Sequence, residues 1–158
     1  MAIDLQKISG LPISFDPKSL KLEFQDDFPF IKKSERSLEE IKPYFKNPEV
    51  KYGPDPAYRV WRWADLKKDD EKIKTANLRY DLTLIPPGTI DSEFIKTAGH
   101  YHIPYPEVYE VLYGRAYFLT QLPGEDYKNI KSAILVETGP GEKFIIPPGF
   151  GHNTINVF

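Results

Sequence analysis

The chain has 158 residues, 41% of them hydrophobic and 28% charged, and a net charge of −2. This composition is typical of one soluble globular domain. It excludes a strongly positive surface for binding nucleic acid, and it excludes a polybasic membrane anchor. Because no apolar run has membrane-spanning length and the N-terminus lacks a secretory pattern, we expect a cytoplasmic protein. The chain has no cysteine, so any metal must be bound by imidazole and carboxylate groups.

The first part of the chain, residues 1–50, is dotted with prolines, and we expect an irregular arm that packs on the rest of the domain. Within it, the segment "RSLEEIKPYF" predicts one short helix, because Ser37 can cap it and Glu40 stands at the capping-box position. Pro43 should stop or kink this helix early.

From residue 58 onward the pattern changes to strands. "YRVWRW" alternates, and "LRYDLTLIPPG" places apolar side chains on one face and Arg79, Asp81 and Thr83 on the other. Further segments bounded by Gly or Pro are "EVYEVLYG", "RAYFLTQLPG", "SAILVETGPG", "KFIIPPG" and "HNTINVF". The charged run "DLKKDDEKIK" indicates a solvated loop. Many short strands with Gly and Pro turns predict an all-β sandwich or barrel over residues 51–158.

Two of the three histidines lie in "GHYHIPYPEVYEVLYG". His100 and His102 are two residues apart and therefore project from the same face of a strand. Glu107 begins the next strand, where its carboxylate can come beside the two imidazoles, whereas Glu110 faces the opposite side of that strand. Gly114 ends the strand in a tight hairpin.

The third histidine, His152, leaves a stiff turn of two prolines and two glycines in "GEKFIIPPGFGHNTIN". A lone histidine on a strand is usually a plain core or surface residue, but here all three histidines fall at ligand spacing. Three imidazoles and one carboxylate suit Fe(II), Mn(II), Ni(II), Co(II) or Zn(II) and leave positions for a substrate. The sequence therefore predicts a metal site.

These two segments resemble the two motifs of the cupin superfamily. The first motif, G-x5-H-x-H-x3,4-E-x6-G, is supplied by His100, His102, Glu107 and Gly114. Phe94 stands where that motif has its first glycine. The second motif, G-x5-P-x-G-x2-H-x3-N, is matched at every fixed position from 141 to 156. The resemblance implies a double-stranded β-helix, or jelly-roll, with a metal inside the barrel.

The chain also resembles a narrower family, the cupin-type glucose-6-phosphate isomerases of archaea and some bacteria. The similar segments run from about Arg36 to Phe158 and include "RSLEEIKPYF", "DPAYRVWRW", "LTLIPPG", "TAGHYH", "EVYEVLYG" and "PPGFGHNTIN". The resemblance implies one divalent metal, with Fe(II) the expected ion, held by His100, His102, Glu107 and His152. It implies that the phosphate is bound by Thr97, Gly99 and Thr83. It implies that the sugar is contacted by Tyr109 and Tyr58.

The implied reaction interconverts glucose 6-phosphate and fructose 6-phosphate. Glu107, either as a loosely held ligand or beside the metal, would move a proton between C1 and C2 through a cis-enediol(ate), and a metal-assisted hydride shift is the alternative. A cupin dioxygenase would use the same ligands but needs an apolar pocket. The segment "TAG" before the first ligand instead offers a small anion-binding nest, which is a feature against a dioxygenase. A sugar-binding cupin without catalysis and phosphomannose isomerase activity stay open.

Members of this family continue for several strands past the second motif, whereas this chain stops at Phe158. We therefore expect one of two explanations: the chain is a cropped or processed fragment, or another segment, from the N-terminal arm or a partner subunit, completes the barrel. Exposed barrel strands and an aromatic-rich N-terminal half favour a homodimer. No nucleic-acid or membrane partner is expected.

Overall fold

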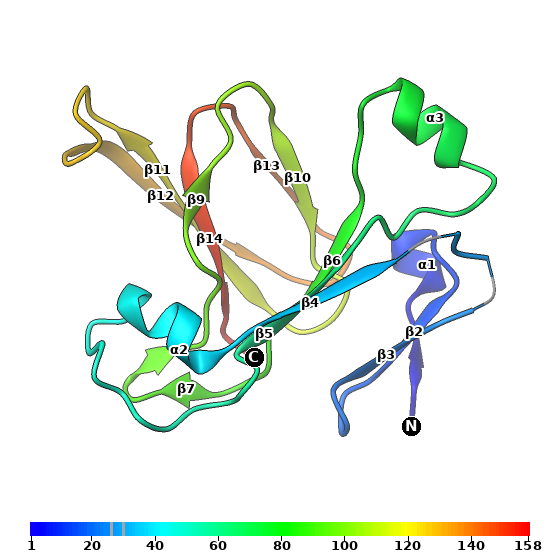
Figure 1. Cartoon of the computed structure of the whole chain (residues 1–158), viewed down its shortest axis with the longest axis horizontal. Coiled ribbons are helices and arrows are strands. Elements are labelled where there is room, and N and C mark those ends of the chain that lie inside the picture. Colours follow the sequence, from blue (N-terminus) through cyan, green and yellow to red (C-terminus); the bar gives the residue numbers. More distant parts are fainter. Residues whose placement is uncertain (26, 30) are drawn as a thin grey trace. The chain divides into compact units, whose positions relative to one another are not determined.

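The computed structural model describes residues 1–25, 27–29 and 31–158 (Figure 1). Strands dominate this part of the chain and helices are few and short, which confirms the predicted all-β class. The chain forms two compact units: unit 1 comprises Met1–Arg36 and Tyr58–Leu84, and unit 2 comprises Ser37–Ala57 and Ile85–Phe158. The expected division into an arm over 1–50 and a barrel over 51–158 stays a prediction. No helix in the described part of the chain is both long and apolar enough to cross a bilayer.

Unit 1 contains two antiparallel three-stranded sheets. The first consists of β1 (Ile3–Asp4), β2 (Ile13–Asp16) and β3 (Lys21–Phe24), with α1 (Gln6–Ser9) between β1 and β2. The second consists of β4 (Lys32–Arg36), β5 (Tyr58–Arg62) and β6 (Asp81–Leu84). As the alternation of β6 predicted, Leu82 and Leu84 are buried and Thr83 is exposed.

The N-terminal part is more regular than its prolines suggested, since β1 to β4 lie within it. The charged run expected to be a loop contains a helix, α3 (Asp70–Thr75), so that prediction was wrong. The helix has acidic residues in its first turn and lysines in its last, as its dipole favours. Lys74 also pairs with Asp70 one turn earlier, at 2.8 Å. Local charge pairing therefore stabilises α3, which lacks a continuous apolar face.

Unit 2 begins with the predicted helix α2 (Leu38–Ile41), followed by the 3-10 helix η1 (Lys42–Tyr44). The capping box is confirmed: the Glu40 amide donates to the Ser37 hydroxyl, and the Ser37 amide donates to the Glu40 carboxylate at 2.8 Å. Pro43 lies in η1, after the single α-helical turn that it was expected to limit. Ile41 faces the core and is 1% exposed.

The larger sheet of unit 2 has the order β12 (Ile130–Thr138), β11 (Ala116–Pro123), β14 (Gly151–Asn156) and β9 (His100–Tyr101). Two smaller antiparallel pairs join β10 (Glu107–Glu110) with β13 (Lys143–Ile146), and β7 (Thr89–Ile90) with β8 (Glu93–Phe94). The chain passes repeatedly between the β10–β13 pair and the larger sheet, an alternation that a jelly roll shows.

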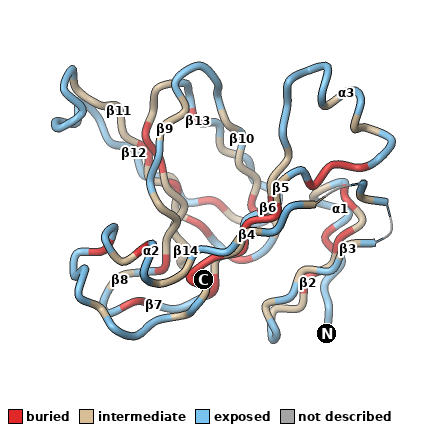
Figure 2. Tube along the Cα trace, viewed as in Figure 1, coloured by how far each residue is buried: buried red, intermediate tan, exposed pale blue. Residues whose placement is uncertain are grey.

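An aromatic core joins these two sheets. Phe118 of β11 is 2% exposed, and its ring contacts those of Tyr109 in β10 and Phe144 in β13, with centroid distances of 5.1 and 5.6 Å. By contrast, the outer strand β12 is exposed along nearly its whole length (Figure 2). The candidate site lies beside this aromatic core, where β9, β10 and β14 meet.

Candidate metal centre

Backbone pairing places the three histidines. His100 in β9 lies directly opposite His152 in β14. His102 follows β9, and its carbonyl accepts a hydrogen bond of 2.9 Å from the amide of Gly149. Gly149 has φ +79°, a left-handed conformation that favours glycine. The Pro/Gly turn before His152 is thus joined directly to the segment that carries the other two histidines.

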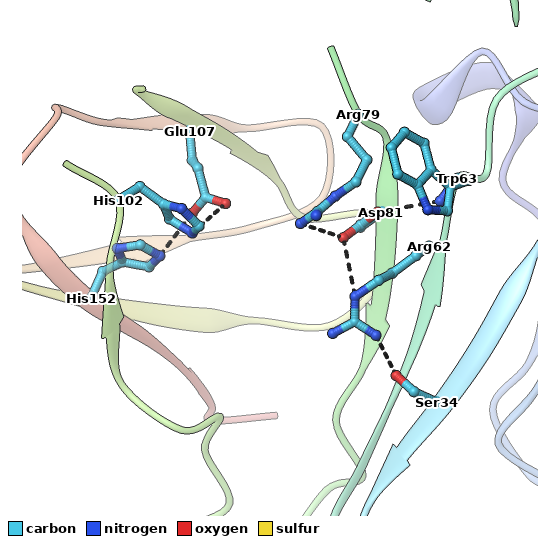
Figure 3. Close-up of polar contacts among 8 residues, drawn as sticks. All are labelled: Ser34, Arg62, Trp63, Arg79, Asp81, His102, Glu107 and His152. Atoms are coloured by element: carbon cyan, nitrogen blue, oxygen red, sulfur yellow. Dashed lines mark hydrogen bonds and ion pairs between the residues drawn. The ribbon is translucent and has the colours of Figure 1, made fainter. Parts of the chain in front are cut away.

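The four predicted ligands converge. One ligand atom from each of His100, His102, Glu107 and His152 lies within 4.8 Å of the others. The Glu107 carboxylate lies 3.1 Å from Nε2 of His102 and 2.8 Å from Nε2 of His152 (Figure 3). The ring centroids of His100 and His152 are 4.5 Å apart. This spacing matches a set of side chains that share one cation, with three nitrogens and one carboxylate as the donor set.

The buried polar atoms of this cluster also fit a cation. Three side-chain atoms of the cluster are buried and lack a hydrogen bond of regular geometry, although they lie close together: Nε2 of His102, Oε2 of Glu107 and Nε2 of His152. Leaving a buried polar atom unsatisfied costs about 1–3 kcal/mol, so native proteins rarely leave three together without a partner. A divalent ion bound among them would satisfy all three.

Two backbone carbonyls orient the imidazoles. Nδ1 of His100 donates to the carbonyl of Ala98, and Nδ1 of His152 donates to the carbonyl of Phe150, each at 3.3 Å. A hydrogen bond at Nδ1 selects the tautomer whose Nε2 lone pair is free to bind a metal. These bonds therefore prepare the two rings as ligands.

Burial and charge set the protonation of the cluster. Burial lowers the pKa of His100 below its ordinary value, which keeps this ring neutral at pH 7 as a ligand must be. Burial raises the pKa of Glu107, but its contact with His152 and the charges of the imidazoles outweigh burial, and the net pKa is lowered. Glu107 is therefore ionised at neutral pH.

The two faces of β10 differ as predicted. Glu107 joins the histidines, whereas the Glu110 carboxylate pairs with Lys143 at 2.6 Å. Tyr109 lies on the Glu107 side, and its ring centroid is 5.8 Å from that of His152. Tyr109 therefore contacts a member of the cluster and the aromatic core at once.

The predicted phosphate residues of unit 2 lie just before β9. The Thr97 hydroxyl accepts a hydrogen bond of 3.0 Å from the amide of Thr154, and the Thr97 amide donates to the Thr154 carbonyl at 2.9 Å. Thr97 thus holds the segment before His100 against β14. Gly99 lies beside the carbonyl of His152, where an added Cβ would sit 3.7 Å away. Phosphate binding by Thr97 and Gly99 stays a prediction.

The other two predicted substrate residues, Tyr58 and Thr83, belong to unit 1. Tyr58 begins β5 and is 6% exposed, whereas Thr83 lies in β6 with its side chain exposed. In the register of the sheet they project from the same face. Their contact with substrate stays a prediction.

One support of the site was not foreseen. Tyr101 lies opposite Gly151, and a Cβ added to Gly151 would sit 2.5 to 2.8 Å from the end of the Tyr101 ring. The Tyr101 hydroxyl accepts a hydrogen bond of 3.1 Å from Nε2 of Gln121. Gly151 is not a fixed position of the second motif, so no sequence signal marks this contact.

Three histidines and one glutamate that could hold a metal, gathered between strands of an all-β fold, match the arrangement that the cupin motifs implied. A family profile described as Glucose-6-phosphate isomerase (GPI) matches residues 36–158. The chain therefore belongs to the glucose-6-phosphate isomerase (GPI) family, which confirms the resemblance seen in its motifs.

The similar curated proteins carry the same name. The chain is 32% identical over 150 residues to glucose-6-phosphate isomerase of Thermococcus litoralis and 28% identical over 154 residues to that of Pyrococcus furiosus. Each match covers 90% of this chain and 73% of the relative. Among solved structures, Drosophila melanogaster CENP-C bound to CAL1 gives a TM-score of 0.35 at 12% identity, over 65% of this chain and 52% of that one, a similarity too low to define a shared fold.

Proposed function

We propose that the chain is a metal-dependent isomerase that interconverts glucose 6-phosphate and fructose 6-phosphate. The observation that carries this proposal is the convergence of His100, His102, Glu107 and His152 within 4.8 Å, in a member of a family named for that activity. Fe(II) is the proposed ion, with Mn(II), Ni(II), Co(II) and Zn(II) as alternatives for the same ligands.

The reaction moves hydrogen between C1 and C2 while a carbonyl becomes a hydroxyl. A divalent ion in this site would act as a Lewis acid for the substrate oxygens. Glu107 removes the proton from one carbon and returns it to the other through a cis-enediol(ate), and its lowered pKa keeps it ionised for this role. A hydride shift is the alternative route.

The remaining roles follow from position. Tyr109 contacts the ring of His152 from the Glu107 side, which supports its role beside the sugar. Thr97, Gly99 and Thr83 are proposed to bind the phosphate, and Tyr58 is proposed to contact the sugar. Within unit 2, Thr97 and Gly99 would hold the phosphate so that C1 and C2 reach Glu107.

A coupled assay on fructose 6-phosphate tests the function. The protein as purified should turn over substrate, a chelator should abolish turnover, and one metal per chain should be found by elemental analysis. Activity that survives complete removal of the metal would contradict the proposal. Reaction in tritiated water separates the routes, because proton transfer through Glu107 incorporates label and a hydride shift does not.

We further propose that the protein works in the cytoplasm as a homodimer, in glycolysis and gluconeogenesis. Exposed apolar side chains on β12, including Ile134 at 46% and Leu135 at 55%, support a partner on that strand. Sedimentation at micromolar concentration should give twice the chain mass, and a monomer there would remove this part of the proposal.

A further inference from the structure

One face of the β4–β5–β6 sheet in unit 1 is rich in positive charge. Residues directly opposite each other in an antiparallel sheet project to the same side, and alternate residues of a strand do so as well. The register pairs Arg62 with both Lys32 and Asp81, and Val60 with both Ser34 and Thr83. We call the side of the sheet that carries these residues the Arg62 face; it also includes Arg36 and Tyr58.

The Arg62 face carries Lys32, Arg36 and Arg62, and Arg79 joins it just before β6 through its ion pair with Asp81. Asp81 is the only carboxylate of these strands on this face. Lys32, Arg62 and Arg79 together outnumber this one carboxylate, and the excess of positive charge attracts an anion.

Two of these arginines are held in place (Figure 3). The Asp81 carboxylate lies 3.0 Å from Nη2 of Arg79 and 3.9 Å from Nε of Arg62, and Nη1 of Arg62 donates to the hydroxyl of Ser34. The side chains of Arg62 and Arg79 are 31% and 46% exposed, against 22% for Asp81. The carboxylate thus anchors both guanidinium groups while leaving them more accessible than itself.

Trp63 adds a second restraint on Arg79. The Arg79 guanidinium carbon lies 5.9 Å from the centre of the Trp63 ring, and the Trp63 amide donates to the Asp81 carboxylate at 3.3 Å. Trp63 has φ +61°, which bulky residues rarely adopt and which persists only where the surroundings hold it, often at binding sites. Ordering the donors beforehand reduces the entropy lost when a ligand binds.

We propose that the Arg62 face binds the phosphate group of a phosphate monoester, with Arg62 and Arg79 as its principal donors. Planar guanidinium groups offer paired N–H donors that match phosphate oxygens, which a lone lysine cannot do. The exposed hydroxyl of Thr83 lies on the same face and can add a neutral donor. The phosphate belongs either to the sugar-phosphate substrate or to a separate anion, and the two sources differ in their kinetic consequences.

The two tryptophans give a site-specific test. Trp63 contacts Arg79, whereas Trp61 projects from the opposite side of the sheet. In a titration of the full chain with inorganic phosphate at constant ionic strength, the indole N–H resonance of Trp63 should shift saturably while that of Trp61 should not. A Trp63 resonance that does not move overturns the proposal, whether or not the protein is an isomerase, because no turnover is measured.

Two variants sharpen this titration. Arg79→Gln should weaken phosphate binding about tenfold or more, since it removes a charged hydrogen-bond donor. Arg59→Gln is the matched control, because Arg59 lies on the other side of β5 and pairs with Glu35 at 3.1 Å; binding should stay within about twofold of wild type.

If this ion network had a purely structural role, the expected phosphate affinities of the variants would differ from those given above. Such a role would leave phosphate affinity equal in Arg79→Gln and Arg59→Gln, and that result overturns the proposal. For the source of the phosphate, a raised KM for fructose 6-phosphate with unchanged kcat in Arg79→Gln identifies the substrate. An unchanged KM together with lost phosphate binding identifies a separate anion.

Discussion

Replacing Gly151 with alanine should disturb the strand that carries His100. An added Cβ at Gly151 would sit 2.5 to 2.8 Å from the end of the Tyr101 ring, closer than real Cβ contacts come. The ring must therefore shift, and the shift is costly because Gln121 and the edge-on ring of Tyr127, at 5.6 Å, contact it. Tyr101 is next to His100 in β9, so displacement of the ring is transmitted to a proposed ligand.

The expected magnitude is modest. Overpacking typically costs about 1–3 kcal/mol, and the Tyr101 hydrogen bond contributes about 1 kcal/mol. Alanine regains roughly 0.5–1 kcal/mol because it loses less conformational entropy than glycine on folding. The free energy of unfolding should therefore fall by about 1–3.5 kcal/mol, which lowers Tm by about 2–14 °C in a chain of this size. Misplacing a metal ligand through its support should weaken metal binding about tenfold.

Thermal unfolding and a titration with Co(II), followed by its absorption bands, measure both quantities. Gly99→Ala is the matched control, because a Cβ there would sit 3.7 Å from the His152 carbonyl, an ordinary contact. Its Tm should stay within about 2 °C of wild type. In a Tyr101→Ala background the Gly151 substitution should have almost no further effect. If Gly151→Ala alone keeps wild-type stability and Co(II) affinity, Tyr101 does not support the site.

Three further changes test the site and its surroundings. Glu107→Gln should lower kcat/KM at least about 100-fold by removing the proposed base, whereas Glu110→Gln, on the other face of the same strand, should stay within about threefold; equal losses would contradict the assignment. Ser37→Ala should reduce stability to urea by about 1 kcal/mol through loss of the capping box, and no change would mean that the cap contributes little. Asn156→Ala should cost about 1–3 kcal/mol, because its side-chain amide donates to the carbonyls of residues 85 and 86 at 2.9 and 3.1 Å; a neutral result in thermal unfolding would show that water replaces it.

Local rules account for much of what the sequence predicted. The helix at Leu38–Ile41 follows from Ser37 and Glu40 because a capping box involves neighbours only three residues apart. The assignment of Glu107 rather than Glu110 to the cluster follows from the two-residue period of a strand. The helix α3 was missed because its support is ionic and its sequence lacks an apolar period.

The sequence by itself determined the all-β class and the identity of the four converging side chains, because strand alternation and motif spacing depend on residues close together in the chain. Only the tertiary structure decided that His100 stands opposite His152, that Tyr101 covers Gly151 and that Arg62 meets Asp81. These contacts depend on strand register, and register is set by pairing between segments far apart in the sequence, where a slip of one residue reverses every side chain.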